Sequence, residues 1–183
     1  VSTQGPILTD NGGSVLLYKT TGYEIGDEVT VSGTISSYNC GFQIGTAGLT
    51  IEKTGTTTVT YPTAVELTGA KMDELLTTRT TDEYAQFVKI VGTVAISGNY
   101  YNFNVDGATT AVGSFYGLTD DQKAKLVDGK LTTIYGYFFS ISKSGGAPKY
   151  INFITTHIDE TPAVANNYTS VLGTAVLNDA VEV

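Results

Sequence analysis

The fold expected for this chain rests on one stretch, Phe87-Val88-Lys89-Ile90-Val91-Gly92-Thr93-Val94-Ala95-Ile96. Its β-branched residues favour an extended strand, and the glycine in its middle suits a strand that bends sharply. Between this stretch and Ile158, the sequence predicts two more strands, one helical segment and two further strands. These lie at 100–105, 111–116, 118–127, 131–142 and 150–157. Three strands, a helix and two strands is the order of an OB-fold, a small five-stranded Greek-key barrel.

The first half of the chain repeats this pattern with one strand fewer. Strands are predicted at 5–9, 14–18, 28–36 and 42–44, and β-like sequence continues over 46–61. A strand with one central glycine occurs in both halves, at Gly33 and at Gly136. We interpret the chain as two divergent barrels, the first of which lacks the counterpart of residues 87–96.

The predicted fold class is therefore all-β with minor α. It consists of two tandem OB-like five-stranded Greek-key barrels, the first lacking its opening strand. Residues 1–62 form the incomplete barrel, 63–83 a linker, 84–160 the second barrel and 161–183 a strand-forming tail. The linker is predicted to hold a short helix at about Thr68–Thr77, because the Thr68 hydroxyl can cap its first turn.

The tail contains an apolar, β-like run at Tyr168–Leu177 that needs a partner, since an isolated apolar strand promotes aggregation. This run can close the first barrel within one chain, or pack on the second barrel. It can also pair with another copy of the chain, as donated strands do in pilus assembly. The alternative is that the missing strand was upstream and has been cut away.

Composition restricts the classes of function. The net charge is −8 and the pI is near 4.4, so the chain as a whole repels phosphate backbones. Cys40 is the only cysteine, which excludes a disulfide within the chain and a metal site built from cysteines. No apolar run has the length of a membrane span, and no signal peptide is visible at Val1, so we expect a processed or trimmed form. Few lysines with abundant Thr, Tyr, Gly and Asn are typical of an exported bacterial surface protein.

Catalytic and metal-binding patterns are not evident in the sequence. His157 is the only histidine, and its acidic neighbours Asp159 and Glu160 do not supply the converging ligands of a metal site. Asp10-Asn11-Gly12 and Asp120-Asp121 lack the alternating oxygen ligands of a calcium loop. No phosphate loop, dinucleotide fingerprint or serine elbow is present. We therefore expect no catalytic residues, no metal, no cofactor and no enzyme activity.

The candidate ligand-binding residues lie on one face of the second predicted barrel. Strand alternation places Tyr100 and Asn102 opposite Tyr101 and Phe103, which read as core. OB-folds bind ligands along the second and third strands and in two loops, here 97–99 and the glycine-rich loop 143–149. The candidates are Tyr100, Asn102, Lys143, Lys149 and Tyr150. Tyrosine with lysine suits bases and phosphates, tyrosine with asparagine suits sugars, and tyrosines that merely cover a sheet face are the structural alternative.

Several segments carry a resemblance to a known family. In the second half they are 87–93, 96–102, 105–110 and 135–138, and in the first half 8–10, 25–31 and 38–39. These segments resemble the tandem OB-like repeats of secreted and surface lipoproteins from Gram-negative gut anaerobes. The resemblance implies an extracellular or outer-surface location and offers no catalytic motif. Its association with nucleic acids rests on analogy of fold, which is a poor guide to function.

The leading hypothesis is a non-enzymatic, exported OB-like module that binds an oligosaccharide or single-stranded nucleic acid, with the acidic charge favouring a glycan. The alternative is a structural surface or filament subunit in which Tyr168–Leu177 completes the barrel of another copy. A hydrolase comes third, because the acidic residues are scattered over turns and linkers and form no evident acid/base pair.

Overall fold

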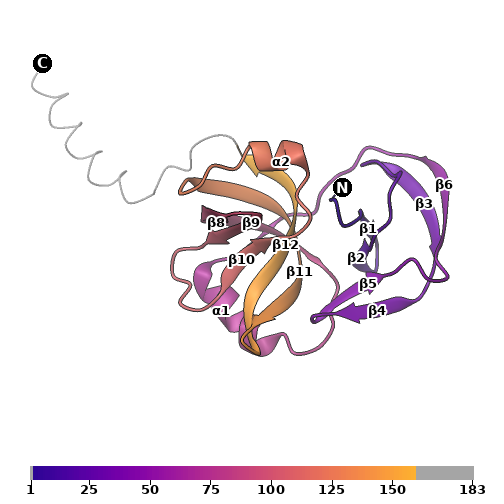
Figure 1. Ribbon diagram of the computed structural model, residues 1–183. Coiled ribbons are helices and arrows are strands. Elements are labelled where there is room, and N and C mark those ends of the chain that lie inside the picture. Colours follow the sequence, from indigo (N-terminus) through magenta and orange to yellow (C-terminus); the bar gives the residue numbers. More distant parts are fainter. Residues whose placement is uncertain (1, 160–183) are drawn as a thin grey trace, which may run out of the picture.

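The computed structural model describes residues 2–159 of the chain, which are mostly β and form two halves lying side by side (Figure 1). The tail predicted at 161–183, with its run Tyr168–Leu177, lies outside the described residues. The second half contains β7 (Val65–Glu66), α1 (Gly69–Thr78), β8 (Gln86–Ser97), β9 (Tyr100–Asn104), β10 (Val112–Phe115), α2 (Asp120–Ala124), β11 (Leu131–Ser144) and β12 (Ala147–Asp159).

Five of these strands close into a barrel. Their order is β8-β9-β10-β12-β11, and β11 pairs again with β8 through residues 131–138 and 86–93. The neighbours are antiparallel except β10 and β12, which are parallel. This confirms the predicted closed five-stranded barrel, with α2 between its third and fourth strands. Short β7 adds a parallel pairing to β8.

The barrel interior is filled by aromatic and branched side chains. Phe103 is fully buried at its centre, with its ring centroid 4.9 Å from that of Phe115 and 6.0 Å from that of Phe153. The predicted central glycine of the long strand, Gly136, lies where a Cβ atom would come 2.1 Å from the Ile154 carbonyl oxygen. The close approach of β11 and β12 therefore requires glycine at this position.

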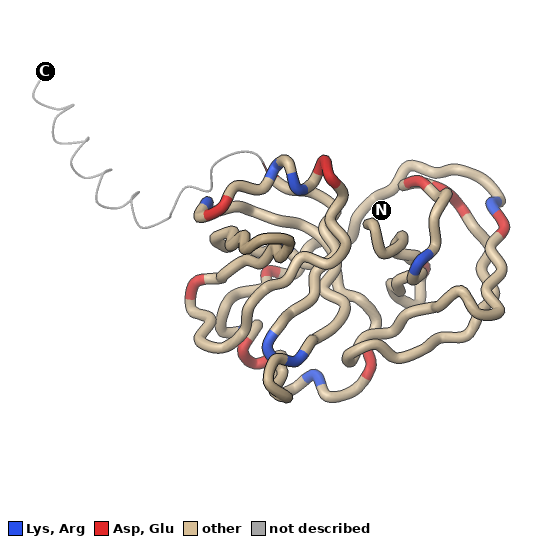
Figure 2. The backbone as a smooth tube through the Cα atoms, in the orientation of Figure 1, with Lys and Arg blue, Asp and Glu red and all other residues tan. Residues whose placement is uncertain are grey.

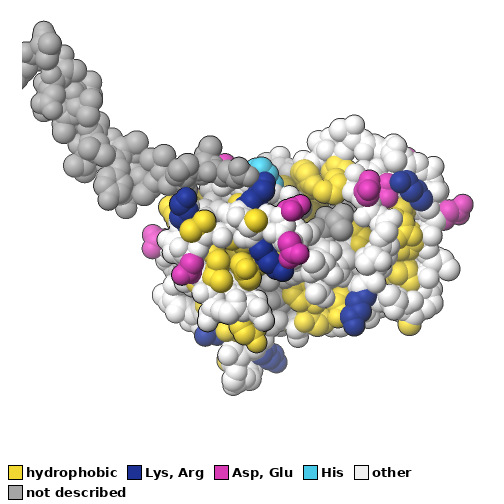
Figure 3. Space-filling model, turned by 45° about the horizontal axis from the view of Figure 1, so that its top comes forward, with side chains coloured by type: hydrophobic (Ala, Val, Ile, Leu, Met, Phe, Trp, Pro, Cys, Tyr) yellow, Lys and Arg dark blue, Asp and Glu magenta, His cyan; other side chains and the backbone are white. Residues whose placement is uncertain are grey.

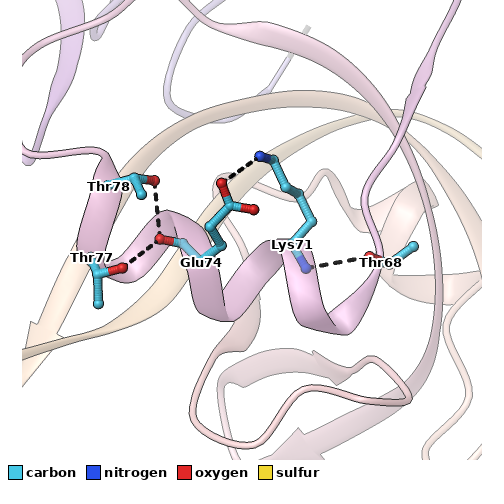
Figure 4. A network of polar contacts seen from close by, with 5 residues as sticks. All are labelled: Thr68, Lys71, Glu74, Thr77 and Thr78. Atoms are coloured by element: carbon cyan, nitrogen blue, oxygen red, sulfur yellow. Dashed lines mark hydrogen bonds and ion pairs between the residues drawn. The ribbon is translucent and has the colours of Figure 1, made fainter.

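Helix α1 forms where the linker was predicted to be helical, and it packs on the second barrel. Thr68 caps its first turn by accepting a hydrogen bond from the Lys71 N–H, and Lys71 pairs with Glu74 (Figure 4). Near its C-terminal end, the hydroxyls of Thr77 and Thr78 donate to the Glu74 carbonyl. The buried side chain of Met72 anchors the helix to the core. Residues 63–83 are therefore not a free linker, because both β7 and α1 are attached to the barrel.

Asp73 of α1 also holds the loop between β9 and β10. Its carboxylate accepts hydrogen bonds from the N–H groups of Thr109, Thr110 and Ala111 and from the Thr109 hydroxyl, at 2.7–3.0 Å. These bonds, led by that of Ala111, hold the pKa of Asp73 well below its ordinary value. The carboxylate thus fixes both the helix and the loop.

The first half contains β1 (Ile7–Asp10), β2 (Gly13–Leu17), β3 (Asp27–Ser32), β4 (Ile35–Tyr38), β5 (Gly41–Ile44) and β6 (Thr50–Thr56). One sheet has the order β1-β2-β5-β4, and β3 pairs with β6 in a separate two-stranded sheet. β1 and β2 are antiparallel, β2 and β5 parallel, and β5 and β4 antiparallel. Within residues 2–159 this half does not close into a second barrel.

Three predicted boundaries need correction. The strand expected at 28–36 is broken, because β3 ends at Ser32 and β4 begins at Ile35, on either side of Gly33. The loop expected at 143–149 is instead the end of a hairpin. Gly145 and Gly146 adopt φ of +58° and +86°, and this tight turn allows the flanking lysines to join the strands. Helix α2 is shorter than the predicted 118–127, starting after the Thr119 cap.

The two halves share an apolar interface and one buried arginine. Tyr38 of β4 stacks on Phe139 of β11, with ring centroids 6.1 Å apart. Arg79, which ends α1, is 4% exposed. Its Nε donates to the Cys40 carbonyl at 2.9 Å, and its Nη2 donates to the Phe139 carbonyl at 2.9 Å and the Glu83 carbonyl at 3.2 Å. One side chain therefore ties β11 of the second half to the β4–β5 turn of the first.

Acidic and basic residues are interspersed over both halves (Figure 2). No helix among residues 2–159 is long and apolar enough to cross a membrane.

Candidate ligand-binding site

A depression of about 400 Å³ lies on the outer face of the closed barrel. All five barrel strands contribute to it, through Ser97, Tyr100, Asn102, Ser114, Ser142, Tyr150 and Asn152. We call this depression the outer-face site. Three of the five candidate residues chosen from the sequence, Tyr100, Asn102 and Tyr150, lie in its lining.

Strand alternation explains why these side chains face outward. On β9, Phe103 enters the core, so Tyr100 and Asn102 point to the opposite face. On β12, Ile151 and Phe153 enter the core, which turns Tyr150 and Asn152 outward. The sequence pattern thus dictates which residues share the site.

Cross-strand register then brings the polar side chains together. Ser114 of β10 lies directly beside Asn102 of β9 on one side and Asn152 of β12 on the other. Residues paired in this way have Cβ atoms about 4.5–5.5 Å apart, so a hydroxyl is flanked by two amides. The row offers both hydrogen-bond donors and acceptors within a short span.

Asn152 is held in one orientation by the protein. It is 4% exposed, and its Nδ2 donates to the Ser140 hydroxyl at 2.8 Å and to the Ser142 hydroxyl at 2.6 Å. Both amide hydrogens of Asn152 are therefore used, and only its side-chain carbonyl oxygen is left to accept a hydrogen bond from a ligand. A fixed amide at the base of a depression lowers the entropic cost of binding.

The two tyrosines differ in exposure. Tyr100 is 75% exposed, the largest exposed fraction among the big hydrophobic and aromatic side chains of residues 2–159, while Tyr150 is half-buried. A ring standing free on a sheet beside polar groups has an apolar face to offer to a ligand.

The two candidate lysines are placed differently from the tyrosines. The Lys149 Nζ lies 5.5 Å from the centroid of the Tyr150 ring, at the margin of the site. Lys143 is exposed on the hairpin, paired with Pro148, and is not part of the lining. None of the seven lining residues is charged.

The five candidates leave out four lining residues, Ser97, Ser114, Ser142 and Asn152, of which Ser97 lies in the loop 97–99 that was expected to bind. For Asn152 a signal was available, since it lies two residues from Tyr150 on the same strand and so shares its face. Ser114 and Ser142 are brought to the site by register between strands far apart in the sequence, which alternation alone does not reveal.

The remaining residues with metal-binding or nucleophilic side chains do not form a second site within residues 2–159. No group of three or more His, Cys, Asp or Glu side chains in residues 2–159 is placed to hold a metal ion. His157 is exposed, with its ring centroid 6.0 Å from that of Tyr135. Cys40 occupies a turn with φ of +63°, where its carbonyl oxygen accepts hydrogen bonds from Arg79 and Glu83.

Comparisons of the chain with protein-family models, with curated proteins and with solved structures found no match.

Proposed function

We propose that the second barrel is an OB-like module of an exported, non-enzymatic protein, and that its outer-face site binds a neutral segment of an oligosaccharide. The observation that carries this proposal is the lining itself: two tyrosines surrounded by hydroxyls and amides, without a charged side chain. The site also includes the second and third barrel strands, where OB-folds bind oligosaccharides and oligonucleotides.

The lining suits the chemistry of a sugar. A pyranose ring has an apolar C–H face and an edge of hydroxyl groups. Exposed tyrosines such as Tyr100 can contact the apolar face, and serine hydroxyls both donate and accept hydrogen bonds with the edge. The volume of about 400 Å³ falls within the ordinary range of small-ligand sites, about 300–1,000 Å³.

Single-stranded nucleic acid is the second candidate, and the site supports it less well. Binding a nucleic acid strand requires cations along its phosphates as well as aromatic rings for its bases. Lys149 beside Tyr150 supplies one cation at the margin, whereas the net charge of the chain is −8. A neutral ligand avoids this repulsion.

We also propose that the first half is a divergent OB-like unit without its opening strand. Its sheet order β1-β2-β5-β4 has the same directions as β9-β10-β12-β11 of the barrel. The β4–β5 hairpin corresponds to the parts of β11 and β12 next to their turn. The β3–β6 pair corresponds to the parts of β11 and β12 far from that turn.

The binding proposal is tested by following amide chemical shifts of the full chain during titration with neutral oligosaccharides and, separately, with a single-stranded DNA oligomer. Asn102→Ala should weaken glycan binding, while Asn104→Ala, on the same face of β9 but outside the lining, should not. Tyr100→Ala should reduce affinity at least about tenfold, because an exposed aromatic contact is lost, with an unchanged melting temperature.

Two results would contradict the proposal. One is a well-folded chain whose shifts at the outer-face site respond to no oligosaccharide. The other is binding to DNA that falls steeply with salt concentration, which would assign the site to nucleic acid through counterion release.

A further inference from the structure

A second cavity, of about 470 Å³, opens between β1 and β3 in the first half. We call it the slot. One wall is formed by residues 6–9 and the other by residues 23–29. Residues 57–62, Leu17 and Ile51 also line it, together with Tyr137, Ile154 and Thr156 of the second barrel.

Each wall of the slot includes part of a strand that has an unpaired edge. Within residues 2–159, β1 pairs only with β2, and β3 pairs only with β6. In the closed barrel the corresponding strands, β9 and β11, are bridged by β8, which is antiparallel to both. The slot therefore lies where the first half lacks the counterpart of β8, between two strand edges that have no strand partner among residues 2–159.

The floor of the slot is apolar. Leu17 is buried at its base, while Leu8, Val29 and Ile51 are only half-buried. Val15, Leu17 and Ile44 form the small core of this half, and Leu8 and Ile51 pack against it. Apolar side chains accordingly reach the surface of the first half as well as the second (Figure 3). An incoming strand would have both backbone partners and a hydrophobic surface to cover.

We propose that residues 168–177 of the same chain occupy the slot as a strand antiparallel to β1 and β3. The proposal is independent of the glycan-binding function. Its first support is position: Thr156 lines the slot, and β12 ends three residues later at Asp159. The eight residues 160–167 separate Asp159 from Tyr168, and extended chain of that length reaches roughly 30 Å.

The second support is the match in length and pattern. β3 offers an edge of six residues and β1 an edge of four, while Tyr168–Leu177 has ten residues and no charge. Alternation would turn one set of small and apolar side chains toward the floor: Thr169, Val171, Gly173, Ala175 and Leu177. By analogy with β8, the first part of the inserted strand would pair with β3 and the last part with β1.

The test compares two variants of the full chain that carry the same new charge at adjacent positions. Val171→Asp places a carboxylate in the set that faces the floor, and Ser170→Asp places it in the set that faces solvent. Residue-resolved amide exchange by NMR is measured at Ile7–Asp10 and Asp27–Ser32. The outward amides of these edges should exchange at least about tenfold faster in Val171→Asp than in the natural chain, and Ser170→Asp should match the natural chain.

Amides of β8 and β11 provide the internal reference, because their exchange should be the same in all three proteins if the barrel stays folded. Equal exchange at the slot edges in all three proteins would overturn the proposal. Protection that grows with protein concentration, together with a dimer in sedimentation, would also overturn it, since the strand would then come from another copy.

Discussion

The two halves of the molecule contain sheets with the same strand directions, but within residues 2–159 only the second half closes into a barrel. In the second half β8 joins β9 to β11, and the inward side chains of β11 are buried. In the first half no described strand joins β1 to β3, and the inward side chains Val29 and Val31 remain half-buried. The half whose strands are bridged has the sealed core, and the half with two unbridged strand edges does not.

The largest difference between the halves should appear when a core side chain is removed. Phe103→Ala should lower the free energy of unfolding by about 3–5 kcal/mol, because it leaves a cavity among fully buried rings. In the chain that also carries Val171→Asp, whose slot is expected to be empty, Ile51→Ala should cost about 1 kcal/mol or less, because Ile51 is only half-buried. Urea unfolding of both variants measures the difference, and equal losses would mean that the two cores are sealed equally.

The contact between the halves should be nearly as sensitive. Arg79→Ala removes the side chain that donates hydrogen bonds to three carbonyl groups, and the bond to the Phe139 carbonyl is buried. The substitution should lower the free energy of unfolding by about 2–4 kcal/mol. Arg79→Lys keeps the charge but loses the forked geometry, so its loss should be smaller. Thermal unfolding gives the comparison, and a loss within experimental error for Arg79→Ala would show that the halves are not joined through this side chain.

The central glycines provide a matched pair of smaller substitutions. A Cβ atom at Gly136 would lie 2.1 Å from the backbone oxygen of Ile154, whereas at Gly33 it would meet the Ile44 side chain at 2.9 Å. Gly136→Ala should therefore cost about 2–3 kcal/mol, and Gly33→Ala should cost about 1 kcal/mol or less because a side chain can move aside. Circular dichroism melting curves of the two variants decide the order, and a reversed order would contradict the equivalence of the strands.

The smallest expected effect concerns pH and the loop fixed by α1. Hydrogen bonds, first that from the Ala111 N–H, lower the folded-state pKa of Asp73. A lowered pKa means that the carboxylate stabilises the fold above its unfolded pKa of about 4, and that this stabilisation is lost as the pH falls toward the folded value.

Asp73→Asn should accordingly melt below the natural chain at pH 7, and the gap between the two melting temperatures should shrink as the pH falls below 4. Asp106→Asn, in the loop itself, is the control for a change of net charge. A gap that stays constant with pH would show that the Asp73 charge does not contribute.

Much of the barrel could be predicted from the sequence because its signals are local. The β-branched run at 87–96, the turn at Gly98 and the Thr68 cap each fix a local conformation, and the structure has β8, its hairpin and α1 at these places. Alternation on β9 was enough to place Tyr100 and Asn102 on one face.

The remaining features depend on contacts between distant segments. The break between β3 and β4 at Gly33 lies between two β-branched stretches, 29–31 and 34–35, so propensity predicts a continuous strand there. Ser114 and Ser142 enter the outer-face site through register with β12, and Arg79 becomes buried only because both halves close around it. Local patterns carry no information on such pairings.

The most direct test of the contrast between the halves is native-state hydrogen exchange on the chain carrying Val171→Asp. The slot of this variant is expected to be empty whether or not the tail fills the slot of the natural chain, so the test does not depend on the tail proposal. The account predicts that amides of β3 and β6 exchange through local openings at lower free energy than amides of β8 and β11, which should exchange only on global unfolding. A single free energy shared by all four strands would contradict it, because a half with an open core would then be as stable as the closed barrel.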